Sequence, residues 1–382
     1  MDWRSSHGSQ DTVDLTAQDA RSAVANQRRD ACDLVMFGMR IARELTFIAA
    51  LAAAPVLSNF AVEESATSKM KAIVIHEYGG PEVLKYEDVP RPEPKQDQIL
   101  VRVIAAGVNP VDDASRSEKY AKFFGITLPF TPGYDIAGVV EKTGAKITKF
   151  KAGDPVFAYL DLKNGGGYAE YAVATEVEAV AKPKSISFTE AAGVPVVALT
   201  AWQALIDKAK LSAGQTVLIH GGSGGVGSFA IQIAKARGAK VIATASTRNQ
   251  DLLKQLGADV AVDYTQQKFE DVAKDVDVVL DSVGKDTLAR SYGVIKKGGV
   301  IVTLVARIDQ AELDKRGIRG VSLGVEPTSN ELAEIGKLID EKKIRVIVSQ
   351  TFPLSEAAKA QEQVATGHTR GKIVLKVADE PQ

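Results

Sequence analysis

The chain has 382 residues, enough for two domains that each bury a core of their own. Its 47 basic and 48 acidic residues give a formal net charge of −1, so no basic excess indicates a nucleic-acid partner. One cysteine, Cys32, excludes an intrachain disulfide, and the 4 histidines are scattered without metal-ligand spacing. The sequence therefore predicts no metal site.

Residues 1–69 differ in composition from the rest of the chain. Their first half is polar and has no periodic apolar pattern, which is typical of disorder. A basic start at Met39, an apolar run Leu45–Leu57 and small residues up to Ala61 then resemble a secretory signal peptide, and the run is too short for a stable membrane span. The alternatives are a cytoplasmic protein with a disordered or loosely packed N-terminus, and an exported, periplasmic protein.

Residues 70–195 alternate short β-forming runs with Gly- and Pro-containing turns. This pattern predicts a mostly β domain with a barrel-like arrangement. The expected strands are Lys71–His76, Gln98–Ala105, Ile136–Lys142, Asp154–Tyr159 and Tyr168–Val173.

Residues 196–335 alternate strands with helices, which predicts an α/β domain with a doubly wound parallel sheet. A helix is expected where apolar residues recur at helical spacing from Val226 to Ala234, and a second over Gln250–Leu256 between Asn249 and Gly257. The expected strands are Thr216–His220, Lys240–Ala245, Val260–Val262, Val276–Asp281 and Val300–Leu304. Residues 336–382, with a helix at Leu354–Ala365 and a strand at Lys372–Val377, are expected to return to the first domain.

A glycine-rich turn separates the first strand and helix of the second domain. It satisfies G-x-G-x-x-G in the strand–turn–helix context that indicates dinucleotide binding. We expect Gly222 to permit the tight turn, Gly224 to let the backbone approach the pyrophosphate, and Gly227 to let the helix pack closely. The predicted pyrophosphate site consists of Gly222, Gly224, Gly225, Val226 and Gly227.

The end of the second strand decides between NADH and NADPH. An NAD site places a carboxylate there to bind the ribose 2′-hydroxyl, whereas this chain has Ser246, Thr247, Arg248 and Asn249. A guanidinium matches the geometry of a 2′-phosphate, so NADPH is the predicted cofactor. The alternative is that Arg248 is a solvated loop residue.

Four ordered motifs extend the pattern over both domains: Ala105–Asp112, Pro132–Gly138, Gly167–Tyr171 and His220–Gly227. With them the chain resembles the medium-chain dehydrogenase/reductase superfamily, in its zinc-free quinone oxidoreductase and enone reductase branch, from Met70 to about Val377. The resemblance implies a GroES-like, mostly β catalytic domain, a Rossmann NADP-binding domain and a homodimer.

The resemblance also implies that zinc is absent. Zinc-bearing relatives have a cysteine where this chain has Asn109, and Gly-His-Glu where it has Gly133–Asp135. No cysteine follows Cys32, so neither thiolate zinc site of those relatives can form. Quinones and α,β-unsaturated carbonyls accept a hydride readily, and hydrogen-bond donors can stabilise the resulting charge without a metal.

By resemblance, residues are assigned to three further places. Asn109 and Tyr134 are candidates to orient the substrate carbonyl; alternatively, Asn109 only builds the turn before Pro110 and Tyr134 is a core aromatic. Asp112 is expected to cap a helix rather than transfer a proton. Tyr264 is placed near the 2′-phosphate, and the nicotinamide side comprises Thr200, Leu304, Val305, Ala306, His368 and Thr369.

The predicted function is NADPH-dependent hydride transfer to a quinone or an α,β-unsaturated carbonyl. Plant enone reductases of this branch carry a lysine at the position of Ala114, and its absence favours a quinone slightly. The alternatives are a non-catalytic NADPH-binding sensor or structural protein, and a trans-acting enoyl reductase.

Overall fold

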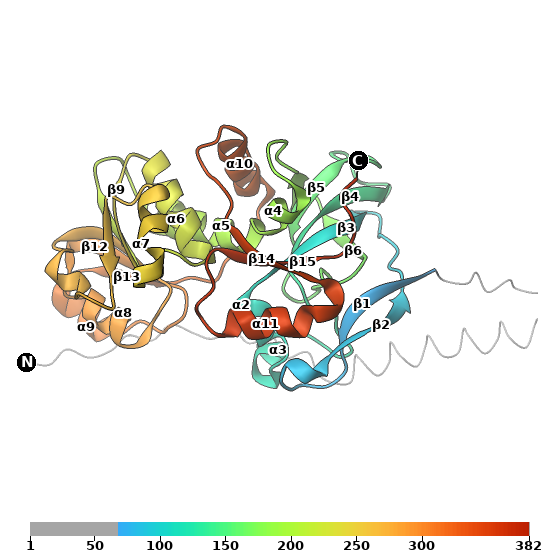
Figure 1. The fold of residues 1–382 in the computed structure, drawn as a ribbon, viewed down its shortest axis with the longest axis horizontal. Coiled ribbons are helices and arrows are strands. Elements are labelled where there is room, and N and C mark those ends of the chain that lie inside the picture. The colour runs from blue at the N-terminus through green and yellow to red at the C-terminus, as the bar shows by residue number, and fades with distance from the viewer. Residues whose placement is uncertain (1–67, 382) are drawn as a thin grey trace, which may run out of the picture. The chain divides into compact units, whose positions relative to one another are not determined.

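The computed structural model describes residues 68–381 (Figure 1). The segment interpreted as disordered or signal-like lies outside the described residues, apart from its last two positions. Within the described range, no helix is long and apolar enough to cross a membrane.

A seven-stranded sheet, mostly antiparallel, forms the framework of the first domain. Its order is β14-β15-β3-β4-β5-β7, and β6 also pairs with β3. Only β14 and β15 run parallel to each other, and β15 lies antiparallel to β3, so the C-terminal segment completes this sheet. The strands are β3 (Gln98–Val108), β4 (Asp135–Thr143), β5 (Pro155–Tyr159), β6 (Tyr171–Thr175), β7 (Ala179–Ala181), β14 (Val348–Pro353) and β15 (Lys372–Lys376).

A separate antiparallel hairpin of β1 (Lys69–Ile75) and β2 (Leu84–Pro90) accompanies this sheet. The strand expected at Tyr168–Val173 begins three residues later, at Tyr171. The backbone N–H of Tyr168 donates to the carbonyl of Pro132 at 2.9 Å, and Ala169 bridges to Ala72. These residues therefore pair with a loop and with β1 before the chain joins β3.

The second domain contains a six-stranded parallel sheet in the order β10-β9-β8-β11-β12-β13. Counted along the chain this is 3-2-1-4-5-6, the order of a Rossmann fold, which confirms the predicted fold class. The strands are β8 (Thr216–Ile219), β9 (Lys240–Ala245), β10 (Val260–Asp263), β11 (Val276–Asp281), β12 (Ile295–Thr303) and β13 (Arg319–Ser322).

Helices surround both sheets (Figure 1). The helix predicted after the glycine turn and the one between Asn249 and Gly257 are both present, as α6 and α7. The α-helices are α2 (Pro110–Ala114), α3 (Glu118–Phe124), α4 (Phe188–Ala192), α5 (Pro195–Trp202), α6 (Gly225–Ala236), α7 (Gln250–Gln255), α8 (Lys285–Ser291), α9 (Gln310–Arg316), α10 (Ser329–Asp340) and α11 (Ala357–Ala365). Short 3₁₀ turns occupy Pro81–Val83, Thr247–Asn249, Phe269–Asp271 and Leu354–Glu356, and a π-helical turn occupies Gln203–Lys208.

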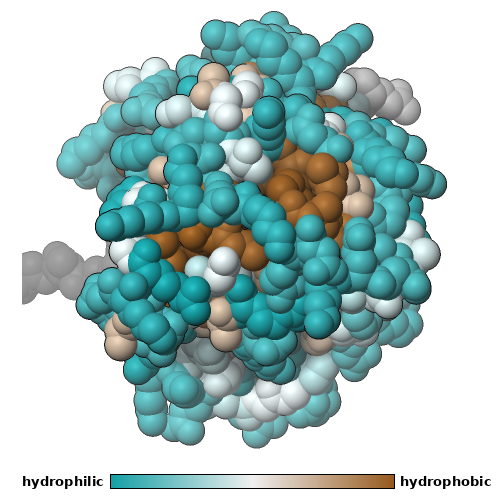
Figure 2. Space-filling model, turned by 90° about the vertical axis from the view of Figure 1, so that its left-hand side faces the viewer, coloured by the Kyte–Doolittle hydropathy of each residue, from teal (hydrophilic) through white to brown (hydrophobic). Residues whose placement is uncertain are grey.

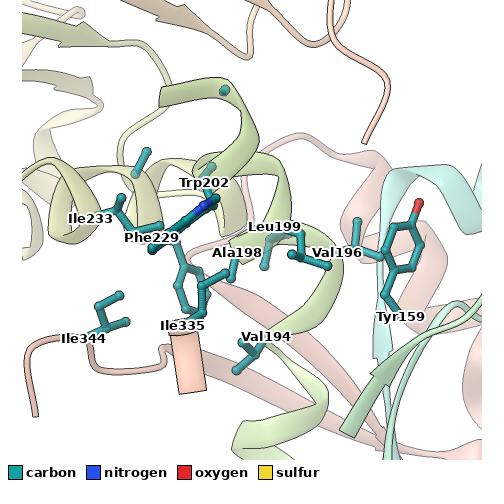
Figure 3. Close-up of a cluster of buried hydrophobic side chains, with 14 of the residues drawn as sticks. Tyr159, Val194, Val196, Ala198, Leu199, Trp202, Phe229, Ile233, Ile335 and Ile344 are labelled. Carbon is teal, nitrogen blue, oxygen red and sulfur yellow. The ribbon is translucent and has the colours of Figure 1, made fainter. Parts of the chain in front are cut away.

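Helix α5 joins the cores of the two domains. All its residues are buried, as expected of a helix that is apolar on every side. Figure 3 shows Trp202 of α5 close to Phe229 of α6, while Val196 lies toward Tyr159 of β5. One continuous apolar cluster thus fixes the orientation of the glycine turn relative to the catalytic domain.

Candidate active site

A cavity of about 1460 Å³ is lined by residues of both domains. It exceeds the roughly 300–1,000 Å³ of a pocket for one small molecule, so it has room for a dinucleotide and a second ligand. Figure 2 shows apolar surface among hydrophilic side chains on one face of the molecule. The predicted cofactor residues that line the cavity are Thr200, Gly224, Gly225, Val226, Gly227, Ser246, Arg248, Asn249, Tyr264, Leu304, Val305, His368 and Thr369.

The glycine turn leads from β8 into α6. Its left-handed residue is Gly221, with φ +70°, rather than Gly222, to which the motif assigned the tight turn. A Cβ on Gly227 would lie 2.2 Å from the carbonyl oxygen of Gly221, so glycine is required where the helix packs against the turn. A Cβ on Gly224 would meet only that same oxygen, at 3.4 Å, which leaves this position open toward the cavity.

The first turn of α6 presents the backbone to the cavity. Gly224 is the N-cap residue and supplies no side-chain cap, and Gly225 and Val226 follow it along the wall. The first N–H groups of a helix have no partner within it and lie at the positive end of its dipole. This arrangement is suited to bind a pyrophosphate.

Three of the predicted cofactor residues do not line the cavity. A Cβ on Gly222 would lie 2.8 Å from Leu253 Cδ2, so Gly222 faces the core beneath the turn. The Thr247 hydroxyl is 3.0 Å from the Thr265 hydroxyl at the surface. Ala306 packs against an apolar cluster of the second domain.

Polar and cationic groups surround the cavity beyond the end of β9. Ser246 and Arg248 line it together with Tyr264, whose ring is exposed, and with Lys268. No acidic residue follows β9 before Asn249, and the one carboxylate among the described residues of the lining is that of Asp271, near Lys268 in the sequence. The guanidinium of Arg248 donates to the carbonyl oxygen of His368 at 3.0 Å, which ties this end of the cavity to the C-terminal segment.

Asn109 lines the cavity at the end of β3, and its side chain belongs to a buried polar network. Its Nδ2 donates to Asp135 Oδ2 at 2.9 Å, and its Oδ1 accepts a hydrogen bond from Lys372 Nζ. Lys372 Nζ also donates to the carbonyl oxygen of Val108 at 2.9 Å and lies 3.4 Å from Asp135 Oδ2. The remaining oxygen of Asp135 accepts the backbone N–H of Val196 at 2.7 Å, in the first turn of α5.

Burial shifts the proton equilibria of this network. Loss of water raises the pKa of Asp135 above its ordinary value and lowers the pKa of Lys372, and the attraction between the two charges opposes both shifts. Because every polar atom of the pair has a hydrogen-bonding partner, we describe it as an ion pair of ammonium and carboxylate.

Asp112 lies directly behind Asn109. Its Oδ2 accepts the backbone N–H of Asn109 at 2.6 Å and the Tyr168 hydroxyl at 2.9 Å, so Asp112 caps α2 as the sequence predicted. Its Oδ1 has no hydrogen-bonding partner in the part of the chain that the structure describes. Burial raises the pKa of this carboxyl to about 7.

Tyr134 occupies a different place from the one its proposed role requires. Its side chain is completely buried in the catalytic-domain core and does not line the cavity, because the chain turns at Gly133 and directs the ring inward. Burial raises the pKa of its hydroxyl above the ordinary range. This position matches the alternative interpretation of Tyr134 as a core aromatic.

Several cavity residues were not singled out from the sequence. Lys372 looks like any lysine at a strand end, and only the pairing of β15 with β3 brings it to Asn109. The hydroxyl of Tyr159 lies 3.4 Å from the carbonyl oxygen of Val325. An apolar wall, which we define by its lining residues, consists of Val111, Ala114, Tyr120, Phe124, Tyr159, Leu162 and Val325.

Among residues 68–381, no group of three or more His, Cys, Asp or Glu side chains is arranged to hold a metal ion. His220 lines the cavity, but its ring nitrogens lie 3.2 Å from the Thr244 hydroxyl and 2.9 Å from the Ser291 hydroxyl. Burial lowers the pKa of His220 to about 4, so the ring is neutral near pH 7.

Two family models match the chain. The alcohol dehydrogenase GroES-like domain matches residues 95–184, and the zinc-binding dehydrogenase family matches residues 256–375. These matches cover parts of the two domains that the structure shows.

Curated and solved relatives match over most of the chain. The chloroplastic NADPH-dependent alkenal/one oxidoreductase of Arabidopsis thaliana is 39% identical over 328 residues, which is 83% of this chain and 82% of the relative. The structure of the quinone oxidoreductase from Coxiella burnetii is 38% identical with a TM-score of 0.76, and the match covers 81% of this chain and all of that one. The Escherichia coli quinone oxidoreductase complexed with NADPH is 29% identical with a TM-score of 0.73, over 80% of this chain and all of that one.

The parallel sheet with its glycine turn, the GroES-like domain and these similarities over most of the chain agree with one another. The chain belongs to the medium-chain dehydrogenase/reductase superfamily, in its quinone oxidoreductase and alkenal/one oxidoreductase branch.

Proposed function

We propose that the protein is an NADPH-dependent reductase that transfers a hydride to an uncharged quinone or α,β-unsaturated carbonyl compound and needs no zinc. The observation that carries this proposal is the single cavity that joins the glycine turn to the apolar wall, with Asn109 on its lining. A dinucleotide and an apolar acceptor can meet there.

The residues present fit NADPH. Gly224 leaves the N-terminal end of α6 open to a pyrophosphate. Ser246, Arg248 and Tyr264 surround the expected 2′-phosphate, and the absence of a carboxylate after β9 favours NADPH over NADH. Thr200, Leu304, Val305, His368 and Thr369 stay assigned to the nicotinamide side. Relatives support this choice, because one is named NADPH-dependent and another is complexed with NADPH.

The apolar wall suits an uncharged acceptor. Its members are aliphatic or aromatic and carry no charge, and of its two tyrosine hydroxyls that of Tyr159 lies near the carbonyl oxygen of Val325. Lys372 lies nearby, but its three N–H groups are directed to Val108, Asn109 and Asp135. Among the described residues that form this wall none is cationic, so the wall, Ala114 included, offers no charge to an anionic substrate.

Bound NADPH supplies a hydride from the C4 position of its nicotinamide. The chain aligns the acceptor with that position and excludes water along the apolar wall. Asn109 lines the cavity, and its Nδ2 has a second N–H without a partner among the described residues; we assign this N–H to the acceptor oxygen, where negative charge develops. The reduced acceptor then takes a proton from solvent, which balances the two-electron reduction.

The same network supports the proposal that the reaction needs no zinc. An ammonium, Lys372 Nζ, contacts both Asn109 Oδ1 and Asp135 Oδ2, the oxygens that a cation at this place would use. A divalent ion would have to displace this charge or be repelled by it. The sequence supplies no thiolate beyond Cys32 to offset that repulsion.

The experiment that tests the proposal is NADPH oxidation, followed by absorbance, with a panel of ortho- and para-quinones, enones and 2-alkenals. We expect turnover with at least one uncharged acceptor, undiminished by a strong chelator, and weaker activity on carboxylated analogues. Tight NADPH binding without turnover on any acceptor would instead support a sensor or structural protein. Turnover only on carrier-bound acyl chains would support a trans-acting enoyl reductase.

Two further expectations belong to this proposal. The homodimer implied by the family is tested by light scattering of the purified chain. The compartment is tested by N-terminal sequencing of the mature protein, since cleavage near Ala61 would indicate export and an intact terminus a cytoplasmic enzyme.

A further inference from the structure

Two contacts fix the side-chain amide of Asn109, and a third holds its backbone. Its Oδ1 faces the ammonium of Lys372, its Nδ2 faces the carboxylate of Asp135 at 2.9 Å, and its backbone N–H is held by Asp112 at 2.6 Å. An amide rotated by 180° would direct its N–H groups at an ammonium and its oxygen at a carboxylate. The two charges therefore determine which end of the amide faces which neighbour.

Lys372 contacts both halves of the cavity. Its side chain is 3% exposed, and a Cβ on Gly225 would lie 3.2 Å from its Cδ, so the aliphatic stem runs beside the first residue of α6. The backbone N–H of the preceding Gly371 donates to the carbonyl oxygen of Ser223 at 2.8 Å. The same residue thus lies against the predicted pyrophosphate turn and holds Asn109 through its ammonium.

We propose that Lys372, paired with Asp135, is a positioning residue for the reduction: it fixes the Asn109 amide so that the free Nδ2 N–H is presented to the acceptor carbonyl beside the cofactor turn. This inference rests on the proposed function. Lys372 does not donate to the acceptor, because its three N–H groups are taken up by Val108, Asn109 and Asp135. Its effect is exerted through Asn109.

A double-mutant cycle tests this dependence. We expect Lys372→Met to lower kcat about 10²-fold, the cost of losing one donor to a developing oxyanion. If Lys372 acts through Asn109, the same replacement in an Asn109→Ala background changes kcat by no more than about twofold. Equal losses in both backgrounds would overturn the proposal.

Two measurements separate positioning from general structural damage. NADPH affinity, measured by fluorescence titration, is expected to stay within about twofold of wild type in Lys372→Met, because the pyrophosphate turn is held by backbone groups. Lys372→Arg, which keeps the charge, is expected to recover part of kcat. The matched control is Lys376→Met on the same strand, where the lysine is exposed and pairs with Asp379, and it should leave kcat unchanged.

Lys372→Met leaves Asp135 as an unpaired buried charge, and the variant could fail to fold for that reason alone. A double variant without either charge avoids this problem. Lys372→Met combined with Asp135→Asn removes both charges together. We expect this variant to fold and to retain the loss of kcat, since nothing then fixes the two ends of the Asn109 amide. Wild-type kcat in this variant would overturn the inference, whereas lack of turnover in the wild-type protein on every acceptor would overturn the proposed function itself.

Discussion

At the scale of single residues, the polar atoms of the site differ in whether their hydrogen bonds are already made within the protein. Asn109 Oδ1 and Lys372 Nζ both line the cavity, yet their hydrogen bonds are made to the protein. Arg248 differs, because within residues 68–381 its guanidinium makes one hydrogen bond, to the carbonyl oxygen of His368, and keeps other N–H groups for a ligand. A guanidinium with free donors at the end of β9 is suited to a phosphate.

Replacement of Arg248 by Ala is expected to weaken NADPH binding by about tenfold or more, because a hydrogen bond to a charged group contributes about 1.5–3 kcal/mol. NADH lacks the 2′-phosphate, so its affinity should change little. Fluorescence titration with both cofactors measures the difference, and Lys254→Ala on α7, an exposed lysine, is the control. An equal loss for NADPH and NADH would contradict the assignment of Arg248.

At the scale of elements, two glycines at the start of α6 have different functions, one in packing and one beside the ligand. Gly227 lets the helix approach the turn, since a Cβ there would lie 2.2 Å from the Gly221 oxygen. Gly224 has no such steric need and borders the cavity instead. One position therefore serves packing and the other serves the ligand.

Gly227→Ala is expected to lower the free energy of unfolding by about 1–3 kcal/mol without any ligand, because the helix must shift away from the turn. Gly224→Ala should leave that free energy within about 0.5 kcal/mol of wild type and weaken NADPH binding, since its methyl group would occupy space beside the pyrophosphate. Urea unfolding and fluorescence titration of both variants check the division. Similar stability losses in the two would contradict it.

At the scale of the whole molecule, each domain buries a group whose shifted pKa makes stability depend on pH between about 4 and 7. In the catalytic domain the pKa of Asp112 is raised to about 7, and in the nucleotide-binding domain the pKa of His220 is lowered to about 4, both by burial. Folded Asp112 keeps a proton that the unfolded chain releases near pH 4, so this group lowers stability as pH rises toward 7. Folded His220 stays neutral down to about pH 4, whereas the unfolded chain binds a proton there below about pH 6.5. Because of this group, stability increases as the pH rises from about 4 to 6.5.

Asp112→Asn removes one of these opposing effects and keeps an oxygen for Asn109 N–H and the Tyr168 hydroxyl. The stability of the variant relative to wild type is expected to increase by about 1.4 kcal/mol per pH unit between about pH 4 and 7, and to be constant above that. Urea unfolding of both proteins at a series of pH values measures this difference. A difference that does not vary with pH would mean that Asp112 is ionised throughout the range.

The sequence by itself determined the features that depend on local pattern. The strand–turn–helix context identified the glycine turn, and Asn249 and Gly257 bounded α7. The missing carboxylate after β9 is the local signal on which the proposal of NADPH rests. These signals are local because backbone conformation and capping depend on neighbours within a few residues.

Only the tertiary structure decided which polar groups meet. Lys372 is far from Asn109 in the sequence and reaches it because β15 adds to β3, and Tyr134 turns into the core because of the loop at Gly133. The sequence also assigned the tight turn to Gly222, whereas the backbone places positive φ at Gly221. Long-range strand pairing and side-chain burial arise from the packing of the whole chain, so a local sequence pattern does not predict them.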